Sequence, residues 1–356
     1  MLLPACVGVA PDPSPPTPSQ SSGNLLRSAT TVTIATDARF PGLCVSDDDE
    51  LMVAYRKSTN HHQDSAATLV ARWSSDNGMT WSAETTIYSS GVDPRDVTLT
   101  TLSDGRIAAT CFHYASPTSY QSRVMFSSDN GRTFGTSVAL TSTALSRVHA
   151  CSGPIVEASD GDLFVAIYGD ASSSDYQSAV VMKSSDDGVT WADTATIASG
   201  PGSIGDAYGP ESQGGFYEPF LHVLADGTIL AAIRHGREKV WFTRSTDGVT
   251  WSTVTNSGVA RGGRPAICQV AETGALVLSD RRDTNQLYTT SWNAGVSWPN
   301  SAVTLNSGYR GAYAQMVEMA PGVLGHVWSM EDIGDISTLY FTALYDSNLT
   351  DPLEGL

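Results

Sequence analysis

The sequence predicts an all-β protein, in the form of a six-bladed β-propeller whose first strand completes the last blade. Three observations carry this prediction: a turn-rich composition, a motif with five copies, and a second hairpin motif between those copies. The 356 residues include 32 Gly and 17 Pro, and 41% are hydrophobic, as in a globular, turn-rich chain. No amphipathic helical stretch of useful length interrupts the pattern.

The first motif reads Ser-x-Asp-x-Gly-x-Thr-Trp, and its chemistry is that of a tight turn. The Asp caps backbone amides, the Gly takes a positive φ, and the Trp folds back as an apolar plug. Spacings of 53, 57, 60 and 47 residues separate the closing aromatic residues Trp81, Phe134, Trp191, Trp251 and Trp298. The fourth copy is one residue shorter and the fifth is degraded. A repeat of about 50 residues predicts one structural unit per copy.

Hairpin turns between the copies, the clearest of them Asp-Gly, form the second repeat and bring the number of units to six. The turns lie at 46–50, 102–106, 158–162, 224–228, 271–274 and 319–322. Runs of strand-forming residues flank them, as hairpins require. The sixth unit, 312–345, has no copy of the first motif. We expect a strand at 30–35 to complete that unit, which removes two exposed sheet edges.

The propeller is predicted to span 26–348, with a tail at 349–356. Residues 1–25 are rich in Pro and Ser and are expected to be flexible. Cys6 follows Leu3-Pro4-Ala5 and resembles the end of a bacterial lipoprotein signal, although no charged segment precedes it. Secretion and lipid anchoring at Cys6 both stay open, and either predicts an extracellular or cell-surface protein.

Charge and motif content exclude several classes of function. The 37 acidic and 20 basic residues give a net charge of −17, which repels nucleic acid and anionic membranes. The sequence contains no run of about 18 apolar residues, so no transmembrane helix is predicted. The sequence has no phosphate-binding loop, nucleotide fingerprint or metal-ligand spacing, so neither a cofactor nor a metal is expected. Buried free thiols are expected, with one disulfide left open, at Cys44, Cys111, Cys151 and Cys268.

In a propeller, the starts of the first strands and the ends of the second strands of all blades meet at one face. The chain has 17 Arg and 3 Lys, and eight of these Arg fall at such positions. They are Arg39, Arg56, Arg95, Arg234, Arg237, Arg264, Arg281 and Arg282. Because a guanidinium binds a carboxylate with paired hydrogen bonds, the predicted ligand is a small anion with a carboxylate group.

The first motif is identified as the Asp-box of bacterial neuraminidase repeats, and residues 26–348 resemble the propeller of a sialidase (exo-α-neuraminidase). An Asp-box indicates a propeller and not an activity, because it lies away from the site. The Arg39-Phe40-Pro41 segment resembles the Arg-Ile-Pro motif, which implies that Arg39 binds the substrate carboxylate. Arg56 matches a supporting arginine, and Asp64 matches the acid/base aspartate.

Four later residues extend the resemblance. Glu218, in a Tyr-Glu-Pro segment, matches the glutamate that activates the nucleophile. Arg234 follows it after an Asp-Gly hairpin and matches the second arginine of the triad. Tyr313 matches the nucleophilic tyrosine, and Glu331 matches the glutamate that orients the first arginine.

Two features stay open. Either Arg281 or Arg282 completes the arginine triad, with Arg264 as a rival, because adjacent strand residues face opposite sides. Arg95 and Asp96 depart from the sialidase pattern and are candidates for binding a different glycon or an aglycon sugar.

The resemblance implies an exo-glycosidase that hydrolyses terminal α-linked sialic acid from glycans with retention of configuration. Sialic acids carry a carboxylate on the anomeric carbon, so a neutral tyrosine avoids the repulsion that a carboxylate nucleophile meets. An ordinary tyrosine has a pKa of about 10 and therefore needs a base. Two alternatives stay open: an enzyme acting on another ulosonic or uronic-acid glycan, as hydrolase or lyase, and a non-catalytic glycan-binding propeller.

Overall fold

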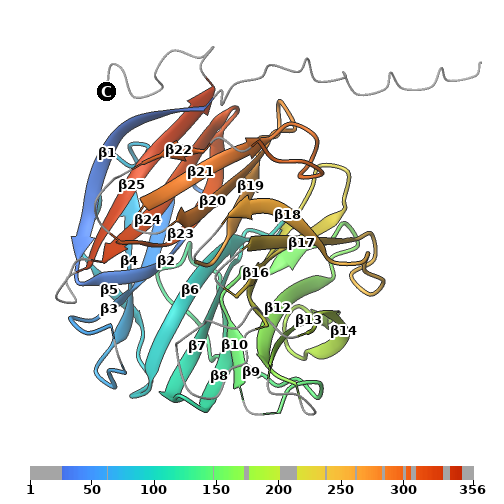
Figure 1. Ribbon diagram of the computed structural model, residues 1–356. Coiled ribbons are helices and arrows are strands. Elements are labelled where there is room, and N and C mark those ends of the chain that lie inside the picture. Colours follow the sequence, from blue (N-terminus) through green and yellow to red (C-terminus); the bar gives the residue numbers. More distant parts are fainter. Residues whose placement is uncertain are drawn as a thin grey trace, which may run out of the picture.

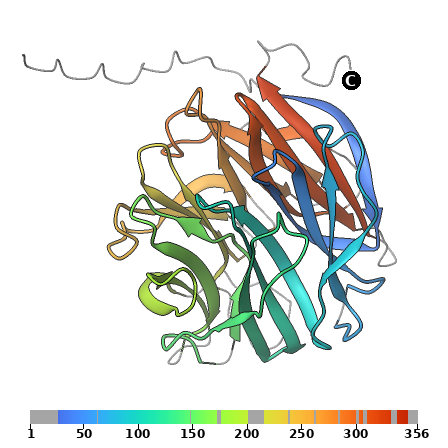
Figure 2. The same ribbon diagram turned by 180° about the vertical axis from the view of Figure 1, so that it is seen from behind.

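The structure is a computed structural model that describes residues 26–61, 63–146, 148–171, 176–200, 215–236, 239–260, 263–282, 285–299, 302–305, 310–331 and 337–346. Within these ranges all regular structure is β-strand and no helix occurs (Figure 1). No helix of the described part is therefore long and apolar enough to span a membrane. The strands form four four-stranded sheets and one nine-stranded sheet. In the opposite view, the first strand of the described chain, in blue, lies beside the last strands, in red (Figure 2).

Three of the four-stranded sheets are antiparallel meanders of consecutive strands. One contains β2 (Ala38–Val45), β3 (Leu51–Lys57), β4 (Thr68–Ser74) and β5 (Thr85–Tyr88). Another contains β15 (Phe216–Val223), β16 (Ile229–His235), β17 (Lys239–Ser245) and β18 (Thr255–Ala260). The third contains β19 (Ala266–Gln269), β20 (Leu276–Arg282), β21 (Asn285–Ser291) and β22 (Val303–Thr304).

The nine-stranded sheet consists of two meanders joined by a short parallel pairing of β10 with β8. The first meander contains β6 (Asp93–Thr101), β7 (Ile107–Ser116), β8 (Ser119–Ser127) and β9 (Val138–Leu140). The second contains β10 (Val148–Cys151), β11 (Val156–Glu157), β12 (Leu163–Asp170), β13 (Gln177–Ser184) and β14 (Ala192–Ala198).

The remaining sheet joins the two ends of the described chain. It contains β23 (Arg310–Ala320), β24 (Val323–Glu331), β25 (Ser337–Asp346) and β1 (Leu26–Thr36). Strand β1 pairs antiparallel with β25, with Val32 opposite Phe341. The expected pairing of the first strand with the last unit is therefore confirmed, and this strand covers the edge that β25 would otherwise expose.

The Asp-box forms the predicted turn and also packs against a neighbouring sheet. In the first copy, the amide of Gly78 donates to Ser74 Oγ over 2.9 Å, and Trp81 Nε1 donates to the Gly78 carbonyl over 3.0 Å. Gly78 has φ +87°, and a Cβ there would lie 2.2 Å from Phe341 of β25. Glycine is therefore required both by the backbone conformation and by the contact.

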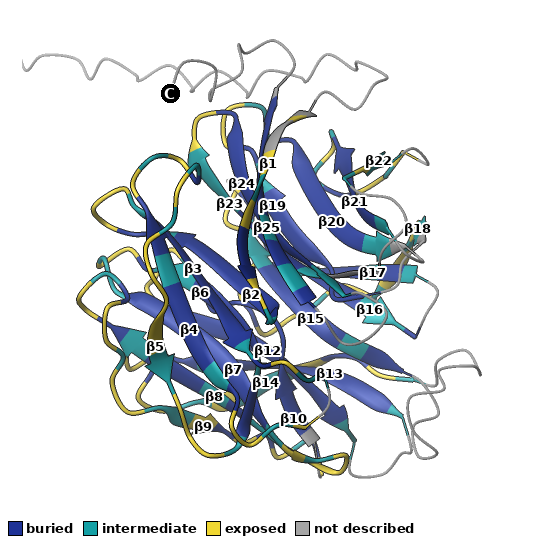
Figure 3. Ribbon diagram, turned by 90° about the vertical axis from the view of Figure 1, so that its left-hand side faces the viewer, coloured by how far each residue is buried: buried dark blue, intermediate teal, exposed yellow. Residues whose placement is uncertain are grey.

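Burial follows the strands, and exposure is concentrated in the connecting loops (Figure 3). The four cysteines within the described residues are buried and free, as predicted. Cys6 and residues 1–25 lie outside the described ranges, as does the tail at 349–356.

Candidate active site

A β-bulge lies near the start of four strands. Three of them, β2, β6 and β15, are the first strands of their meanders, and the fourth is β23 of the last sheet. The register shifts lie between Arg39 and Gly42 in β2, Arg95 and Thr98 in β6, Tyr217 and Phe220 in β15, and Gly311 and Ala314 in β23. Three bulge residues have positive φ: Phe40 at 55°, Asp96 at 54° and Glu218 at 49°. All three are buried. A bulge changes the direction of a side chain, so the repeat places different side chains at equivalent backbone positions.

The central contact joins Tyr313 to Glu218, two residues 95 positions apart in the sequence. The Tyr313 hydroxyl donates a hydrogen bond to Glu218 Oε1. Arg234 Nη1 donates to both oxygens of the same carboxylate, over 3.2 and 3.1 Å. The structure thus brings together the three residues that the sequence proposed as nucleophile, base and second arginine.

The pKa of Tyr313 is raised well above its ordinary value. Burial of the phenol is the main cause, and the negative charges of Glu218 and Asp96 add to it, while Arg234 opposes them. The phenol is therefore neutral near neutral pH, with its proton already directed at a carboxylate.

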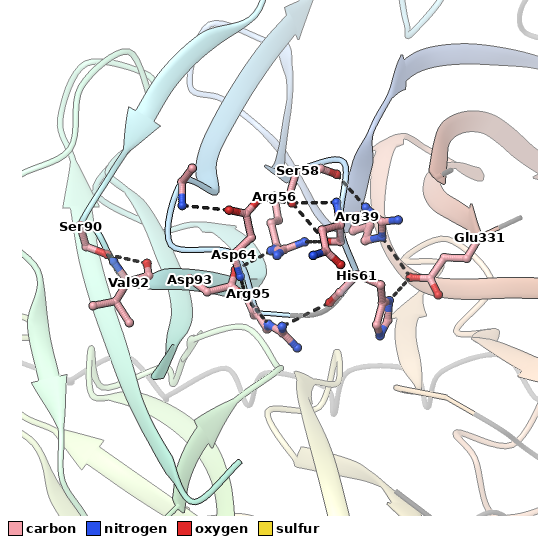
Figure 4. Close-up of polar contacts among 12 residues, drawn as sticks. Arg39, Arg56, Ser58, His61, Asp64, Ser90, Val92, Asp93, Arg95 and Glu331 are labelled. Atoms are coloured by element: carbon pink, nitrogen blue, oxygen red, sulfur yellow. Dashed lines mark hydrogen bonds and ion pairs between the residues drawn. The ribbon is translucent and has the colours of Figure 1, made fainter. Parts of the chain in front are cut away.

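Arg39 and Glu331 form a second group beside this pair (Figure 4). The side chain of Arg39 is fully buried, Nη1 donates to the Ser58 carbonyl over 2.7 Å, and Nε lies 3.6 Å from Glu331 Oε1. His61 Nδ1 lies 2.9 Å from that same oxygen. Burial on its own raises the pKa of Glu331, but the His61 hydrogen bond and the charges of His61, Arg39 and Arg281 together lower it. Glu331 is therefore an ionised carboxylate that lies beside Arg39.

Three arginines were candidates for the third position of the triad: Arg281, Arg282 and Arg264. The side chain of Arg282 lies outside the described part of the chain. A Cβ placed on Gly263 would lie 3.5 Å from Arg281 Nε and 3.7 Å from Tyr313 Cδ1. Gly263 therefore lies against both Arg281 and Tyr313. Arg264 is buried at 1% exposure, and its terminal nitrogens donate to backbone carbonyls.

Arg56 and Arg95 share one carboxylate, that of Asp93 (Figure 4). Asp93 is fully buried and accepts from Arg56 Nε over 2.6 Å and from Arg95 Nε over 2.8 Å. Sequence reasoning missed Asp93. The available signal was its position two residues before Arg95, because strand residues two apart share a face.

Asp64 lies in the loop beside this cluster and accepts from Ser58 Oγ over 2.5 Å and from the Ala66 amide over 3.0 Å. The Ser58 hydrogen bond is the main reason that the pKa of Asp64 is lowered, with the Ala66 amide and Arg56 contributing. Its carboxylate is therefore ionised in the unliganded protein.

Arg95 and Asp96 are separated by the bulge into different environments. Arg95 lies over the Tyr114 ring, 4.1 Å from its centroid, with 12% of its side chain exposed. Asp96 is 3% exposed and accepts from Ser152 Oγ over 2.7 Å. Burial raises the pKa of Asp96 to about 6, although the charge of Arg264 opposes the shift. Of the two, Arg95 is nearer the surface and Asp96 lies in the interior.

Comparisons with known proteins agree with this fold. The family described as BNR repeat-like domain matches residues 112–325, which include Glu218, Arg234 and Tyr313 but not Arg39 or Asp64. No curated protein matches the chain in sequence.

Several solved structures share the fold at low sequence identity. A protein of unknown function from Dyadobacter fermentans is 18% identical, with a TM-score of 0.76 and coverage of 90% of this chain and 99% of that one. A Hadza microbial sialidase is 17% identical, with a TM-score of 0.66 and coverage of 88% and 66%. The intramolecular trans-sialidase from Ruminococcus gnavus is 12% identical, with a TM-score of 0.67 and coverage of 88% and 96%.

These similarities establish that the all-β fold is similar to sialidase folds. The family match spans more than half of the chain. The chain therefore belongs to the BNR repeat-like domain family, which confirms the membership of a BNR-repeat family predicted from the Asp-boxes.

Proposed function

We propose that the protein is an exo-glycosidase that hydrolyses terminal α-linked sialic acid from glycans with retention of configuration. The observation that carries the proposal is the hydrogen bond from Tyr313 to Glu218, whose carboxylate also accepts from Arg234. Most glycosidases use two carboxylates, and a tyrosine nucleophile is the arrangement by which sialidases depart from them. A base within hydrogen-bond reach of the hydroxyl is what activates such a nucleophile.

Arg39, Arg234 and Arg281 would bind the carboxylate of the substrate. Glu331 lies beside Arg39, and Glu218 accepts from Arg234, so two of these arginines are already held in place. A guanidinium fixed in this way binds a carboxylate with little loss of side-chain freedom. Arg281 is more exposed than the deeply buried Arg264 and lies against Gly263, which also faces Tyr313, so it is favoured as the third arginine.

In the reaction, the Tyr313 oxygen attacks the anomeric carbon while its proton passes to Glu218. Asp64 protonates the leaving oxygen and then takes a proton from water in the second step. Because the Ser58 hydrogen bond lowers the pKa of Asp64, this role requires the bound glycan to exclude water and raise that pKa. Arg56 would support this region through Asp93.

The proposal includes six units of four or five strands around one axis. The nine-stranded sheet divides into two meanders, which with the other four sheets makes six units. Strand β2 contacts β6 on one side and β23 on the other, and β19 contacts both β15 and β23. The packing of Gly78 against Phe341 joins the first unit to the last. A crystal structure with another number of units would overturn this part.

A second candidate is an enzyme that acts on another ulosonic or uronic-acid glycan. The position of Arg95 favours it, because a partly exposed guanidinium on the Tyr114 ring is an additional site for an anionic substituent. A product with ultraviolet absorption from a new double bond would identify a lyase.

The test is release of methylumbelliferone from its α-N-acetylneuraminic acid glycoside. We expect wild-type turnover, and a loss of roughly 10²- to 10⁴-fold in Tyr313→Phe. Tyr340→Phe is the matched control, since Tyr340 stacks on Trp328 in the last sheet and should keep full activity. No turnover by the folded wild type would reject the proposal, and binding of sialic acid unaffected by Tyr313→Phe would point to a glycan-binding protein.

A further inference from the structure

Arg264 is buried and binds the backbone of three different units. Its Nη1 donates to the Ser152 carbonyl over 3.0 Å. Its Nη2 donates to the Pro41 carbonyl over 3.0 Å and to the Ala314 carbonyl over 2.9 Å. These acceptors follow β10 or lie in β2 and β23, so one guanidinium joins inner strands that are far apart in the sequence.

The same guanidinium lies beneath the proposed nucleophile. Arg264 Cζ is 5.1 Å from the centroid of the Tyr313 ring, within the range of a cation–π contact. The three acceptors of Arg264 are neutral carbonyl oxygens, so these hydrogen bonds do not themselves neutralise its positive charge. That charge favours any negative charge that develops on the phenol.

Asp96 is the buried carboxylate that opposes this effect. Its bulge position is equivalent to that of Glu218, and Ser152 joins it to Arg264: the Ser152 hydroxyl donates to Asp96 and the Ser152 carbonyl accepts from Arg264. The ionisable groups that interact with Asp96 are Arg264, Glu218, Arg95, Tyr313, Tyr168, Cys111 and Cys151.

We propose that Arg264 and Asp96 are positioning residues for the reaction of Tyr313. Arg264 fixes the ring and stabilises the charge that forms when the Tyr313 proton passes to Glu218, and Asp96 limits that stabilisation when it is ionised. No proton leaves Arg264 in this step, and the electron pair of the Tyr313 O–H bond remains on the oxygen that forms the new bond to carbon. The reaction itself is that of the proposed function, on which the inference rests.

A titration by NMR tests the coupling without any substrate. The protein is labelled with ¹³C at Cζ of tyrosine, and the Tyr313 resonance is identified by its loss in Tyr313→Phe. Since the pKa of Asp96 is about 6, the Tyr313 resonance should show an inflection near that pH in the wild type. The inflection should be absent in Asp96→Asn and present in Asp226→Asn, a control in an exposed hairpin turn. An inflection that persists in Asp96→Asn, or its absence in the wild type, would overturn the coupling.

Kinetics test the positioning role. In the wild type, kcat should fall as Asp96 ionises through about pH 6, because its negative charge limits the stabilisation by Arg264, and this fall should be absent in Asp96→Asn. Arg264→Lys keeps the charge but loses the fork, so kcat should fall at least about tenfold with KM nearly unchanged. The control Arg244→Lys removes another arginine that donates to a backbone carbonyl. A fall in kcat near pH 6 that persists in Asp96→Asn, or an unchanged kcat in Arg264→Lys, would contradict the role, whereas an inactive wild type would reject the proposed function and leave the NMR result decisive for the pair.

Discussion

The Asp-boxes and the strand bulges are both repeated elements, and they use repetition in opposite ways. In the boxes, the same side chains make the same bonds: Ser74 and Ser184 each accept from a glycine amide over 2.9 Å. In the bulges, the backbone repeats but the side chain changes, from Asp96 to Glu218. The comparison teaches that constant residues carry the fold, while differences at equivalent positions supply the chemistry.

The largest expected effect lies at a bulge. Glu218→Gln should lower turnover of the sialic acid glycoside by roughly 10²- to 10⁴-fold, because the amide cannot take the Tyr313 proton. Steady-state kinetics measure the loss. The matched box variant Asp186→Asn should keep turnover per folded molecule, since Asp186 bonds only within its turn among the contacts described. Equal losses in both variants would contradict the division of roles.

An intermediate effect is expected on stability, where the positive φ of an Asp-box glycine can be separated from its contact with the neighbouring unit. Gly188 lies in an Asp-box, and Gly161 lies in the hairpin turn at 158–162. Gly188 and Gly161 have φ of +88° and +87°, but a Cβ on Gly188 would lie 2.2 Å from Phe126, whereas Gly161 faces open space. Gly161→Ala should cost about 1 kcal/mol in free energy of unfolding from backbone strain alone. Gly188→Ala should cost about 3 kcal/mol or more, because overpacking is added. Urea denaturation measures both, and equal costs would show that the contact between units contributes nothing.

The smallest effect concerns the loop that carries Asp64. Ser58→Ala removes the hydrogen bond that does most to lower the pKa of Asp64, so this pKa should rise toward its ordinary value. Carboxyl NMR measures the shift, and kcat at neutral pH should change by less than about tenfold. A pKa that stays unchanged would mean that the Ala66 amide and Arg56 hold the carboxylate instead.

Much of the fold could be predicted from the sequence because its signals are local. The box turn depends on residues within eight positions, and the pairing of β1 with β25 was predicted from an additional strand that precedes the first unit. Tyr313, Glu218 and Arg234 were also predictable together, through the family resemblance.

The polar contacts beneath the site could not be predicted, because they join units across the centre of the molecule. Asp93 bridges two arginines from different sheets, and Arg264 binds carbonyls of three units. The spacing of Asp93 and Arg95 indicates that they share a face of one strand, but no spacing encodes the contact of Asp93 with Arg56 or the contacts of Arg264. The bulge that places Arg95 near the surface and Asp96 in the interior was likewise invisible in the alternation of strand residues.

The stereochemistry of the first product tests the central claim most directly. Proton NMR can follow the anomeric form of sialic acid released from an α-glycoside before it equilibrates. A Tyr313 nucleophile activated by Glu218 predicts two displacements, and therefore the α-anomer as first product. Release of the β-anomer first would mean a single displacement by water and would contradict the account.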